Sequence, residues 1–264
     1  MSWLRTRAGY ELFCNRDERL TRLPARPPAL LEAEGVRFLA PVDGDFGGSW
    51  IGVNEAGLSL CVLNRHDDAA GHGRELSGTE HEFESRGLLL TSLMHCRSVA
   101  EAMHRVESAH LSRFRPFTLF AIAPDRAPLA AHWTGRRLSF ETGGDSLMPL
   151  TSSSYEPADV AESRKKLFRQ LTAASHVTTA DVLLDFHRSH APARGPVSVC
   201  MHRDDAATVS FSRVRVSEGL VEFSYRPGAP CSGARALKVS LPRTRQRERR
   251  RAAEGSETWH CRLL

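Results

Sequence analysis

The chain has no apolar run approaching the roughly 20 residues that a helix needs to cross a bilayer. Its first residues also lack the basic segment, the apolar stretch and the small-residue cleavage site of a secretory signal. We therefore expect a cytoplasmic protein without a transmembrane segment. With 264 residues and 41% hydrophobic content, the chain is long enough for one large domain with a sizeable core.

Cysteine pairs with the spacing of metal ligands are also absent. Six cysteines are scattered along the chain: Cys14, Cys61, Cys96, Cys200, Cys231 and Cys261. This pattern is typical of reduced, mostly buried thiols and indicates neither a disulfide framework nor a zinc site. His187 and His190, three residues apart on an expected helix, could share a metal or a haem iron. A solvated helix face is the commoner origin of such spacing, so we predict no metal ligands.

A basic stripe with interleaved aromatic residues is missing from residues 1–240, which argues against nucleic-acid binding. The formal net charge is +5, but residues 241–264 alone hold seven Arg and three Glu. We assign residues 1–240 to a single domain and residues 241–264 to a basic tail. The tail could touch RNA or an anionic surface, although its composition is more typical of a solvated, partly disordered extension.

Strands are predicted by two-residue alternation and helices by apolar residues on one face. Strands are expected over residues 3–4, 10–14, 50–53, 58–63, 117–123, 129–133, 137–141, 197–202, 208–216 and 220–225. Helices are expected over residues 86–96, 98–110, 159–174 and 179–190. In the third helix, Arg164, Lys165 and Lys166 are expected to form a basic face. Residues 22–35, rich in Pro, Ala and Glu, are expected to form a surface loop.

Strand hairpins therefore lie at both ends of the domain, with two helical pairs between them. Alternating strand–helix–strand units are absent, which argues against a parallel, doubly wound sheet. The order favours antiparallel sheets covered by helices, an α+β fold.

The most distinctive motif is the tetrad Asn15-Arg16-Asp17-Glu18, which follows the apolar strand over residues 10–14. A strand that ends in an amide, a cation and two carboxylates places fixed charges at the rim of a sheet, where substrates often bind. The alternative is a surface loop that carries an ion pair.

A second motif surrounds Trp50. Gly47 and Gly48 precede it and would let the backbone pass close to a ligand or a neighbouring segment. The hairpin that follows places Trp50 in the core or at its rim.

The tetrad occurs together with the run Gly47 to Asn54, with Gly57-Leu58 and Asn64, and with the later segments Leu150 to Ser154 and Cys200 to Ala206. In this combination the chain resembles bacterial members of the NRDE family, which includes the transport-and-Golgi-organisation proteins of eukaryotes. The resemblance spans roughly residues 1–232. It implies a fold similar to the N-terminal-nucleophile (Ntn) hydrolases, a four-layer α-β-β-α sandwich with two packed antiparallel sheets.

The resemblance also implies a mechanism. Ntn hydrolases use the residue exposed by removal of the initiator Met as nucleophile and its own α-amine, with a pKa of about 7.7–8.0, as base. Family members commonly begin Met-Cys-Thr-Val, whereas this chain begins Met1-Ser2-Trp3. Ser2 would lie about 10 Å along the strand from the usual position, so we do not predict it as nucleophile. Either the start site is placed too late or this member lacks the chemistry, and Cys14 is expected to be inert.

Arg16 and Asp17 are the predicted catalytic residues, which would orient a nucleophile or clamp a substrate carboxylate; a structural ion pair is the alternative. Asn15 and Asn64 are candidate donors to an oxyanion, although Asn64 could hold a turn instead.

Four further residues complete the predicted substrate-binding set: Glu18, Trp50, His202 and Arg203. His202, followed by Arg203 and Asp204, could form a base with its orienting carboxylate, although a strand-end His in a solvated turn is commoner.

Two functions remain open at this point. The first is hydrolysis or transfer of an acyl group from a small amide or thioester. The second is a non-catalytic carrier of haem or of a lipid or acyl-CoA, or a trafficking protein, as the resemblance suggests. Either function implies a small-molecule ligand without a resident cofactor, although haem could be that ligand. The oligomeric state stays open.

Overall fold

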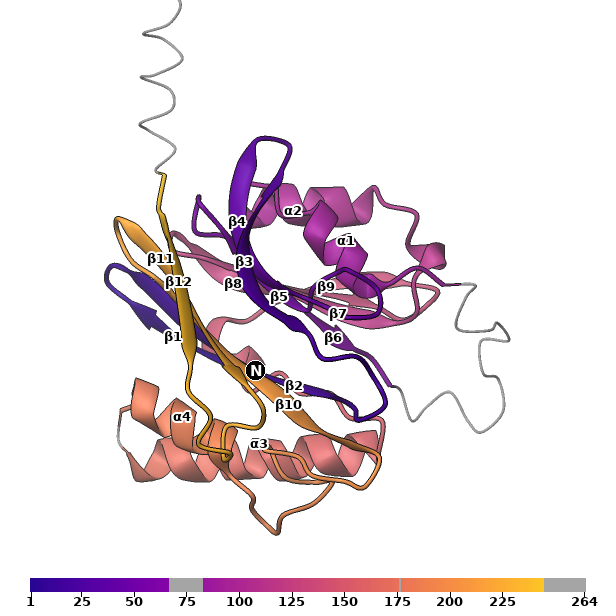
Figure 1. The fold of residues 1–264 in the computed structure, drawn as a ribbon, viewed down its shortest axis with the longest axis vertical. Helices are drawn as coiled ribbons and strands as arrows, with labels where there is room; N and C mark the ends of the chain where they lie inside the picture. The colour runs from indigo at the N-terminus through magenta and orange to yellow at the C-terminus, as the bar shows by residue number, and fades with distance from the viewer. Residues whose placement is uncertain (67–82, 176, 245–264) are drawn as a thin grey trace, which may run out of the picture.

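The computed structural model describes residues 1–66, 83–175 and 177–244. These residues form two antiparallel sheets packed face to face, with helices on both outer faces (Figure 1). The predicted domain boundary at residue 240 falls inside the last strand, and most of the predicted basic tail lies outside the described residues. None of the helices in the described residues is long and apolar enough to span a membrane.

The first sheet joins the two ends of the chain. Its five strands run in the order β1-β2-β10-β11-β12, and each neighbouring pair is antiparallel. The strands are β1 (Ser2–Thr6), β2 (Gly9–Arg19), β10 (Ala206–Val216), β11 (Leu220–Pro227) and β12 (Leu237–Pro242). Gly9 has a positive φ of 157°, and a Cβ there would lie 2.0 Å from the carbonyl oxygen of Val216. This close approach explains why glycine turns the chain from β1 into β2.

The second sheet is a meander in which each strand pairs with the next along the chain. Its seven strands follow the order β3-β4-β5-β6-β7-β8-β9. The strands are β3 (Arg26–Ala33), β4 (Val36–Val42), β5 (Ile51–Asn54), β6 (Ser59–Asn64), β7 (Phe117–Ala123), β8 (Arg126–Trp133) and β9 (Leu138–Thr142).

The central core lies between the two sheets. Alternate residues of β1 and β2 point into it, among them Trp3 and Leu12, and they meet Ile51 and Phe120 of the second sheet. Trp3 stacks on Phe120 with 4.5 Å between ring centroids. The two-residue period of the sequence therefore produces a buried inner face on each sheet.

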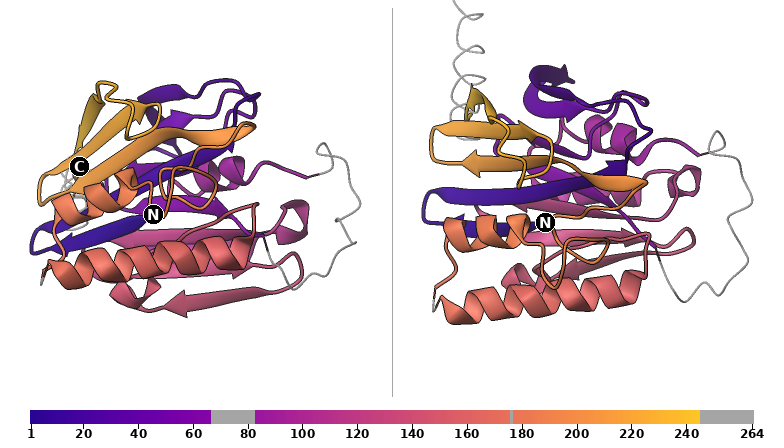
Figure 2. Two further views of the ribbon diagram at one scale, coloured as in Figure 1. Left: turned by 90° about the horizontal axis from the view of Figure 1, so that it is seen from below. Right: turned by 60° about the horizontal axis from the view of Figure 1, so that its bottom comes forward.

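Helices cover the outer faces (Figure 2). α1 (Arg86–Ser92) and α2 (Val99–Glu107) bury apolar side chains against the seven-stranded sheet. α3 (Pro157–Ala174) and α4 (Ala180–Arg188) do the same against the five-stranded sheet, around Phe13 and Phe211. Short 3-10 turns occupy Leu111–Arg113 and Gly144–Leu147. The layers are helix, sheet, sheet and helix, which confirms the predicted α+β sandwich.

Three predictions of local structure were wrong. Residues 26–33, expected in a loop, form the edge strand β3. Residues 197–202, expected as a strand, are irregular. The tetrad does not follow the end of a strand but lies within β2, which continues to Arg19. Its side chains therefore alternate between the two faces of the five-stranded sheet.

Candidate functional site

The candidate site lies where β1 begins. The backbone nitrogen of Met1 is an amino group in this chain, and it donates a hydrogen bond of 2.7 Å to the carbonyl oxygen of Leu150. Two residues on, the amide of Trp3 lies 3.3 Å from the sulfur of Met148. The start of the first strand is thus fixed against the segment that leads into α3. Burial lowers the pKa of the Met1 amino group below its ordinary value.

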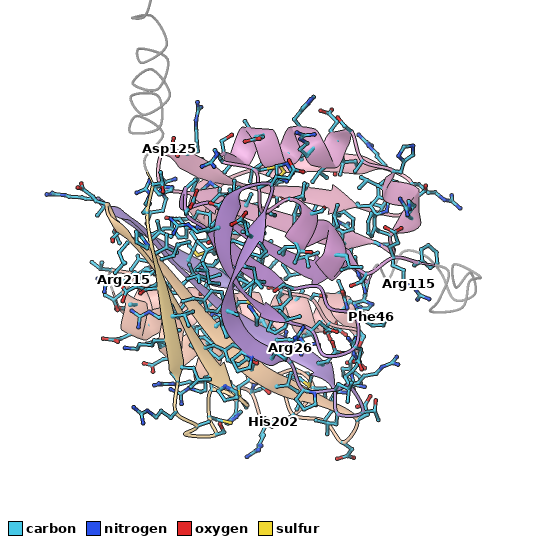
Figure 3. The ribbon with its side chains drawn as sticks, turned by 45° about the horizontal axis from the view of Figure 1, so that its top comes forward. Arg26, Phe46, Arg115, Asp125, His202 and Arg215 are labelled. Atoms are coloured by element: carbon cyan, nitrogen blue, oxygen red, sulfur yellow. The ribbon has the colours of Figure 1, made fainter. Side chains whose placement is uncertain are left out.

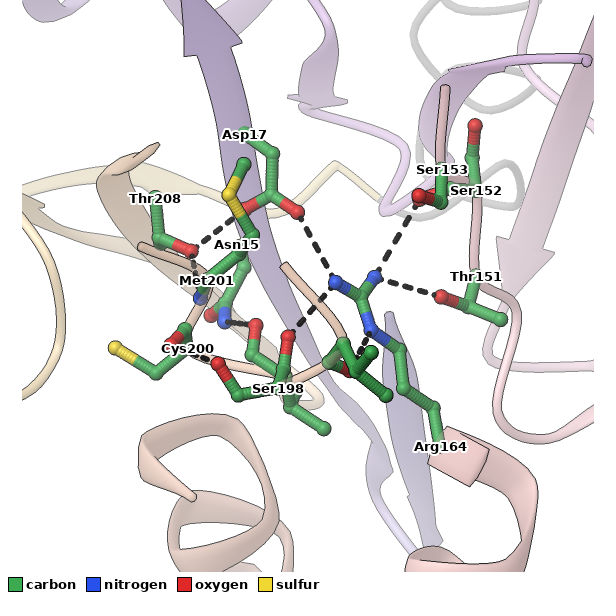
Figure 4. A network of polar contacts seen from close by, with 12 residues as sticks. Asn15, Asp17, Thr151, Ser152, Ser153, Arg164, Ser198, Cys200, Met201 and Thr208 are labelled. Atoms are coloured by element: carbon green, nitrogen blue, oxygen red, sulfur yellow. Dashed lines mark hydrogen bonds and ion pairs between the residues drawn. The ribbon is translucent and has the colours of Figure 1, made fainter. Parts of the chain in front are cut away.

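Arg164 is the centre of the polar network beside this amino group (Figure 4). Its guanidinium donates to the carbonyl oxygens of Ser198 at 2.8 Å and Val197 at 3.2 Å, and to Oγ1 of Thr151 at 3.0 Å. It also lies 3.7 Å from a carboxylate oxygen of Asp17. Arg164 is only 6% exposed, so one buried cation joins α3, the segment after Leu150 and the segment before β10.

Asp17, a predicted catalytic residue, belongs to this network. Its Oδ1 accepts a hydrogen bond of 2.6 Å from the hydroxyl of Thr208 on β10. The same hydroxyl oxygen accepts a hydrogen bond of 2.9 Å from the amide of Met201. The Asp17 carboxylate is therefore held by a hydroxyl on one side and by the Arg164 cation on the other, while a quarter of it stays exposed.

Arg16 and Glu18 point to the other side of β2. Arg16 pairs with Asp43 at 2.5 Å and with Glu18 at 3.3 Å, and its guanidinium lies 4.3 Å from the centre of the Trp50 ring. The predicted residues Arg16, Glu18 and Trp50 therefore come together. Arg16 forms its ion pairs with Asp43 and Glu18 rather than with Asp17.

Asn15 faces the helical layer, where it orients His187. The Asn15 amide donates to the carbonyl oxygens of His187 and Val199 at 3.1 and 2.9 Å. Its Oδ1 must then accept from Nδ1 of His187, 3.0 Å away. This fixes the tautomer, so that Nε2 of His187 accepts from the hydroxyl of Ser2, also at 3.0 Å.

His187 is therefore not on a solvated helix face, as its spacing from His190 suggested. Its side chain is fully buried, and burial holds its pKa well below the ordinary value. Because Ser2 is also fully buried and bonded to this ring, the Ser2 hydroxyl is on the helical side of the sheet.

A cavity of about 420 Å³ lies beside the segment that binds the Met1 nitrogen, and none of the described residues that line it belongs to β1. Leu150, which binds the Met1 nitrogen, and Thr151, which binds Arg164, both belong to its wall. The predicted residue Asn64 lies in the wall as well, and its carbonyl oxygen accepts a hydrogen bond from the Ser152 hydroxyl. Further lining residues include Arg65, His66, His132, Glu141, Ser153 and Lys165.

The predicted pair His202 and Arg203 lies elsewhere. Arg203 makes a two-pronged ion pair with Asp205 at 2.8 and 2.7 Å. The ring of His202 contacts His190 and Cys200 instead of a carboxylate. The structure thus brings Asn15 and Asp17 into one network with Arg164, and Arg16 with Glu18 and Trp50 into a second. Asn64 lies at the cavity, and the His202 side chain lies in a fourth location, with His190 and Cys200.

Sequence reasoning missed Arg164 and Thr208. Arg164 was expected on a basic, solvated face of its helix. The sequence did carry a signal, because Arg164 lies four residues from both Val160 and Phe168, and all three are buried on α3. Thr208 carried no separate signal, since in the sequence it is one more residue of the strand expected over residues 208–216.

Comparison with known proteins decides the family. A family model described as Transport and Golgi organisation 2 matches residues 2–204. The chain belongs to this family. The match confirms the resemblance drawn from the tetrad and the Trp50 segment. No curated protein matches the chain.

Solved structures support the fold. A mutant of the conjugated bile acid hydrolase from Clostridium perfringens matches with a TM-score of 0.55 and 11% identity, over 91% of each chain. Penicillin V acylase from Agrobacterium tumefaciens gives a TM-score of 0.51 and 10% identity, over 89% of this chain and 83% of that one. The Caenorhabditis elegans N-acylethanolamine-hydrolyzing acid amidase ortholog gives 0.53 and 10%, over 78% and 86%. At these identities the likeness shows a shared Ntn-hydrolase-like fold.

Proposed function

We propose that this protein hydrolyses an acyl group from a small amide or thioester, with a nucleophile presented from the start of β1. The observation that carries the proposal is the placement of the Met1 nitrogen. It is buried, it is bound to Leu150 in the wall of a cavity of about 420 Å³, and Arg164 and Asp17 contribute to its electrostatic environment. The names of the structural neighbours, a hydrolase, an acylase and an amidase, support the same class of reaction.

In this proposal the base is the α-amine of the nucleophilic first residue, and the Met1 nitrogen shows the surroundings that the start of β1 offers to an amine. Desolvation by burial is the main cause of the lowered pKa of the Met1 nitrogen; Cys14 and Cys61 raise that pKa, Arg164 lowers it, and Asp17 raises it. A lowered pKa favours the neutral form of an α-amine, which can accept a proton. The Asp17 carboxylate then stabilises the ammonium that forms, and Arg164 holds Asp17 and the cavity wall in place.

The reaction balances with water as the second substrate. The nucleophile gives its proton to the amine and attacks the acyl carbonyl. The C–N or C–S bond breaks, and the leaving amine or thiol takes the proton from the ammonium. Water then attacks the acyl–enzyme bond and releases the acid, which restores the nucleophile. Asn64, in the cavity wall, is the proposed amide donor to the oxyanion.

Arg16 receives a positioning role in this proposal. Its guanidinium binds Asp43 and lies over the Trp50 ring beside β2. Glu18 belongs to the same arrangement.

The nucleophile itself is the first thing to test. The Ser2 hydroxyl is bonded to the ring of His187, and Ser2 is not among the residues that line the cavity. Protein isolated from its native host should be measured by intact mass and amino-terminal sequencing. It should then be assayed with an activated amide and an activated thioester. We expect a first residue that carries a thiol or a hydroxyl, and a burst of one leaving group per chain.

The matched variants are Asp17→Asn in the network and Asp204→Asn on the exposed surface. Both replace one carboxylate by an amide of the same shape. We expect Asp17→Asn to lower kcat/KM by about tenfold or more, or about 1.4 kcal/mol, and Asp204→Asn to leave it unchanged. Equal activity of the two variants, or no turnover by protein with an intact nucleophile, would contradict the proposal.

The second candidate is a carrier that binds a ligand without turnover. The position of the Ser2 hydroxyl favours it, since that hydroxyl is bound to His187 and Ser2 does not line the cavity. His66, His132, Arg65 and Lys165 in the cavity wall would suit haem or an anionic acyl-CoA. Titration with haem and with acyl-CoA distinguishes the two functions. Tight binding without any acyl-enzyme supports the carrier.

A further inference from the structure

Two histidines and two cysteines converge outside the cavity. The ligand atoms of His190, Cys200, His202 and Cys231 all lie within 4.8 Å of one another. His190 follows α4, Cys200 and His202 precede β10, and Cys231 lies between β11 and β12. Figure 3 labels His202 at the edge of the molecule. Three separate segments thus deliver four soft or borderline ligands to one point.

Four of the six distances within this cluster are close to the edges of a small tetrahedron, and the other two, from His190 to the sulfurs, lie within 4.8 Å. The two sulfurs are 3.5 Å apart, and the Nε2 atoms of the two histidines are 3.2 Å apart. Nε2 of His202 lies 3.5 Å from each sulfur. Zinc at its usual bond lengths in a tetrahedron of two Cys and two His would give edges of about 3.8 Å between sulfurs, about 3.3 Å between nitrogens and about 3.5 Å between the two kinds.

A disulfide or a set of plain hydrogen bonds would account for this cluster less completely. A disulfide between Cys200 and Cys231 would use the two sulfurs but would not need both imidazole Nε2 atoms directed at the same point. Plain hydrogen bonds would leave two weak thiol donors and two imidazoles to satisfy one another at a partly buried position. A cation at the centre satisfies all four groups at once.

We propose that these four residues bind one zinc ion in a closed structural site. Binding deprotonates both thiols, releases the two protons to solvent and uses Nε2 of each histidine as a neutral donor. The spacing of the ligands along the chain hid this site from sequence analysis, since the four positions contain no Cys-x-x-Cys pair. The inference is independent of the proposed function.

One contact has to change when the metal binds. Arg194 lies 3.3 Å from Nδ1 of His202, and a metal on Nε2 leaves the ring proton on Nδ1. Two donors would then face each other. Arg194 is exposed, so its side chain can turn into solvent. Removing it should therefore leave the zinc content intact.

The zinc would brace the segment that supports the candidate site. Cys200 and His202 flank Met201, whose amide donates to Thr208 at 2.9 Å. Just ahead of them, the carbonyl oxygen of Ser198 accepts from Arg164 at 2.8 Å. This segment pairs with β10 in an isolated bridge between His202 and Ala207, and four metal bonds would add to that limited pairing.

The test is metal analysis of the full chain, purified under reducing conditions and dialysed against metal-free buffer. We expect about one zinc per chain by mass spectrometry of the elements. After removal of zinc by a chelator, cobalt should restore visible absorption bands typical of tetrahedral thiolate coordination. Thermal unfolding should begin at a lower temperature in the metal-free protein than in the zinc-loaded protein.

Cys231→Ser is the informative variant, because Cys231 is exposed and its loss leaves the core intact. It should lose the zinc and the cobalt bands while keeping its far-ultraviolet circular dichroism. Cys96→Ser, which removes a thiol outside the cluster, and Arg194→Ala should both keep about one zinc per chain. Wild-type protein that holds no zinc and gives no cobalt bands would overturn the inference. So would a Cys231→Ser variant with the same metal content as the wild type.

Discussion

Replacing Arg164 by Met tests the network that supports the candidate site. The change removes a buried cation and leaves the carbonyl oxygens of Val197 and Ser198 without their donors. Asp17 loses the cation 3.7 Å from its carboxylate. Because a buried group that loses its partner costs about 1–3 kcal/mol, we expect Arg164→Met to lower the free energy of unfolding by about 4 kcal/mol.

A loss of this size is measurable in two ways. Urea unfolding should show a lower midpoint with an unchanged slope, and Tm should fall by about 8–16 °C for a domain of this length. Arg164→Lys keeps the charge but lacks the planar fork that reaches two segments, so it should lose about half as much.

Lys166→Met is the matched control, since it removes one positive charge from an exposed position of the same helix. It should change the free energy of unfolding by about 0.5 kcal/mol at most. If Arg164→Met were no more harmful than Lys166→Met, the network would not hold these segments together and the reasoning would be refuted.

Three further predictions follow from the described contacts. Burial holds the pKa of His187 well below the ordinary value of 6.5 that the group has in the unfolded chain, so wild-type stability should fall as pH drops below 6.5, by about 1.4 kcal/mol per pH unit from this group. His187→Gln should remove that part of the pH dependence of the free energy of unfolding, measured with urea. Parallel pH profiles of wild type and variant would contradict this prediction. Gly48→Ala should lower the free energy of unfolding by about 3 kcal/mol, because a Cβ there would lie 2.4 Å from the backbone carbonyl carbon of Gly87. Gly47→Ala has open space around its Cβ but a φ of +72°, so it should lower the free energy of unfolding by about 1 kcal/mol. Equal losses of Tm in the two variants would show that the close approach of Gly48 to Gly87 is unimportant. Arg16→Ala should lower stability by about 2 kcal/mol through the loss of its pair with Asp43 while leaving kcat/KM of the folded protein unchanged; a selective loss of turnover would instead make Arg16 catalytic.

The sandwich was predictable because apolar and polar residues alternate along most of its strands and because its helical pairs lie between hairpins. The missed strand β3 contains Pro27 and Pro28, which usually indicate a loop. It is tolerated as a strand because β3 is the edge of its sheet and its pairing is irregular between Arg26 and Ala29. Composition alone cannot tell an edge strand of this kind from a surface loop.

The site was predictable only in part. Asn15 and Asp17 were found because the family motif marks them, whereas the direction of each side chain depended on how far β2 continues. Residues 197–202 alternate like a strand, yet several of their backbone groups bond to the side chains of Arg164, Asn15 and Thr208, and they pair with β10 in an isolated bridge between His202 and Ala207. Such side-chain partners from distant parts of the chain leave no local pattern.

The most direct test of the central claim is to locate an acyl group on the protein. The first residue of protein from the native host would be determined, and its reaction with an activated acyl substrate would be quenched during turnover. The protein would then be digested and its peptides analysed by mass spectrometry. The account predicts one acyl group per chain on the peptide that begins β1, and a loss of its formation in Asp17→Asn. An acyl group on any other peptide, or none during measured turnover, would contradict it.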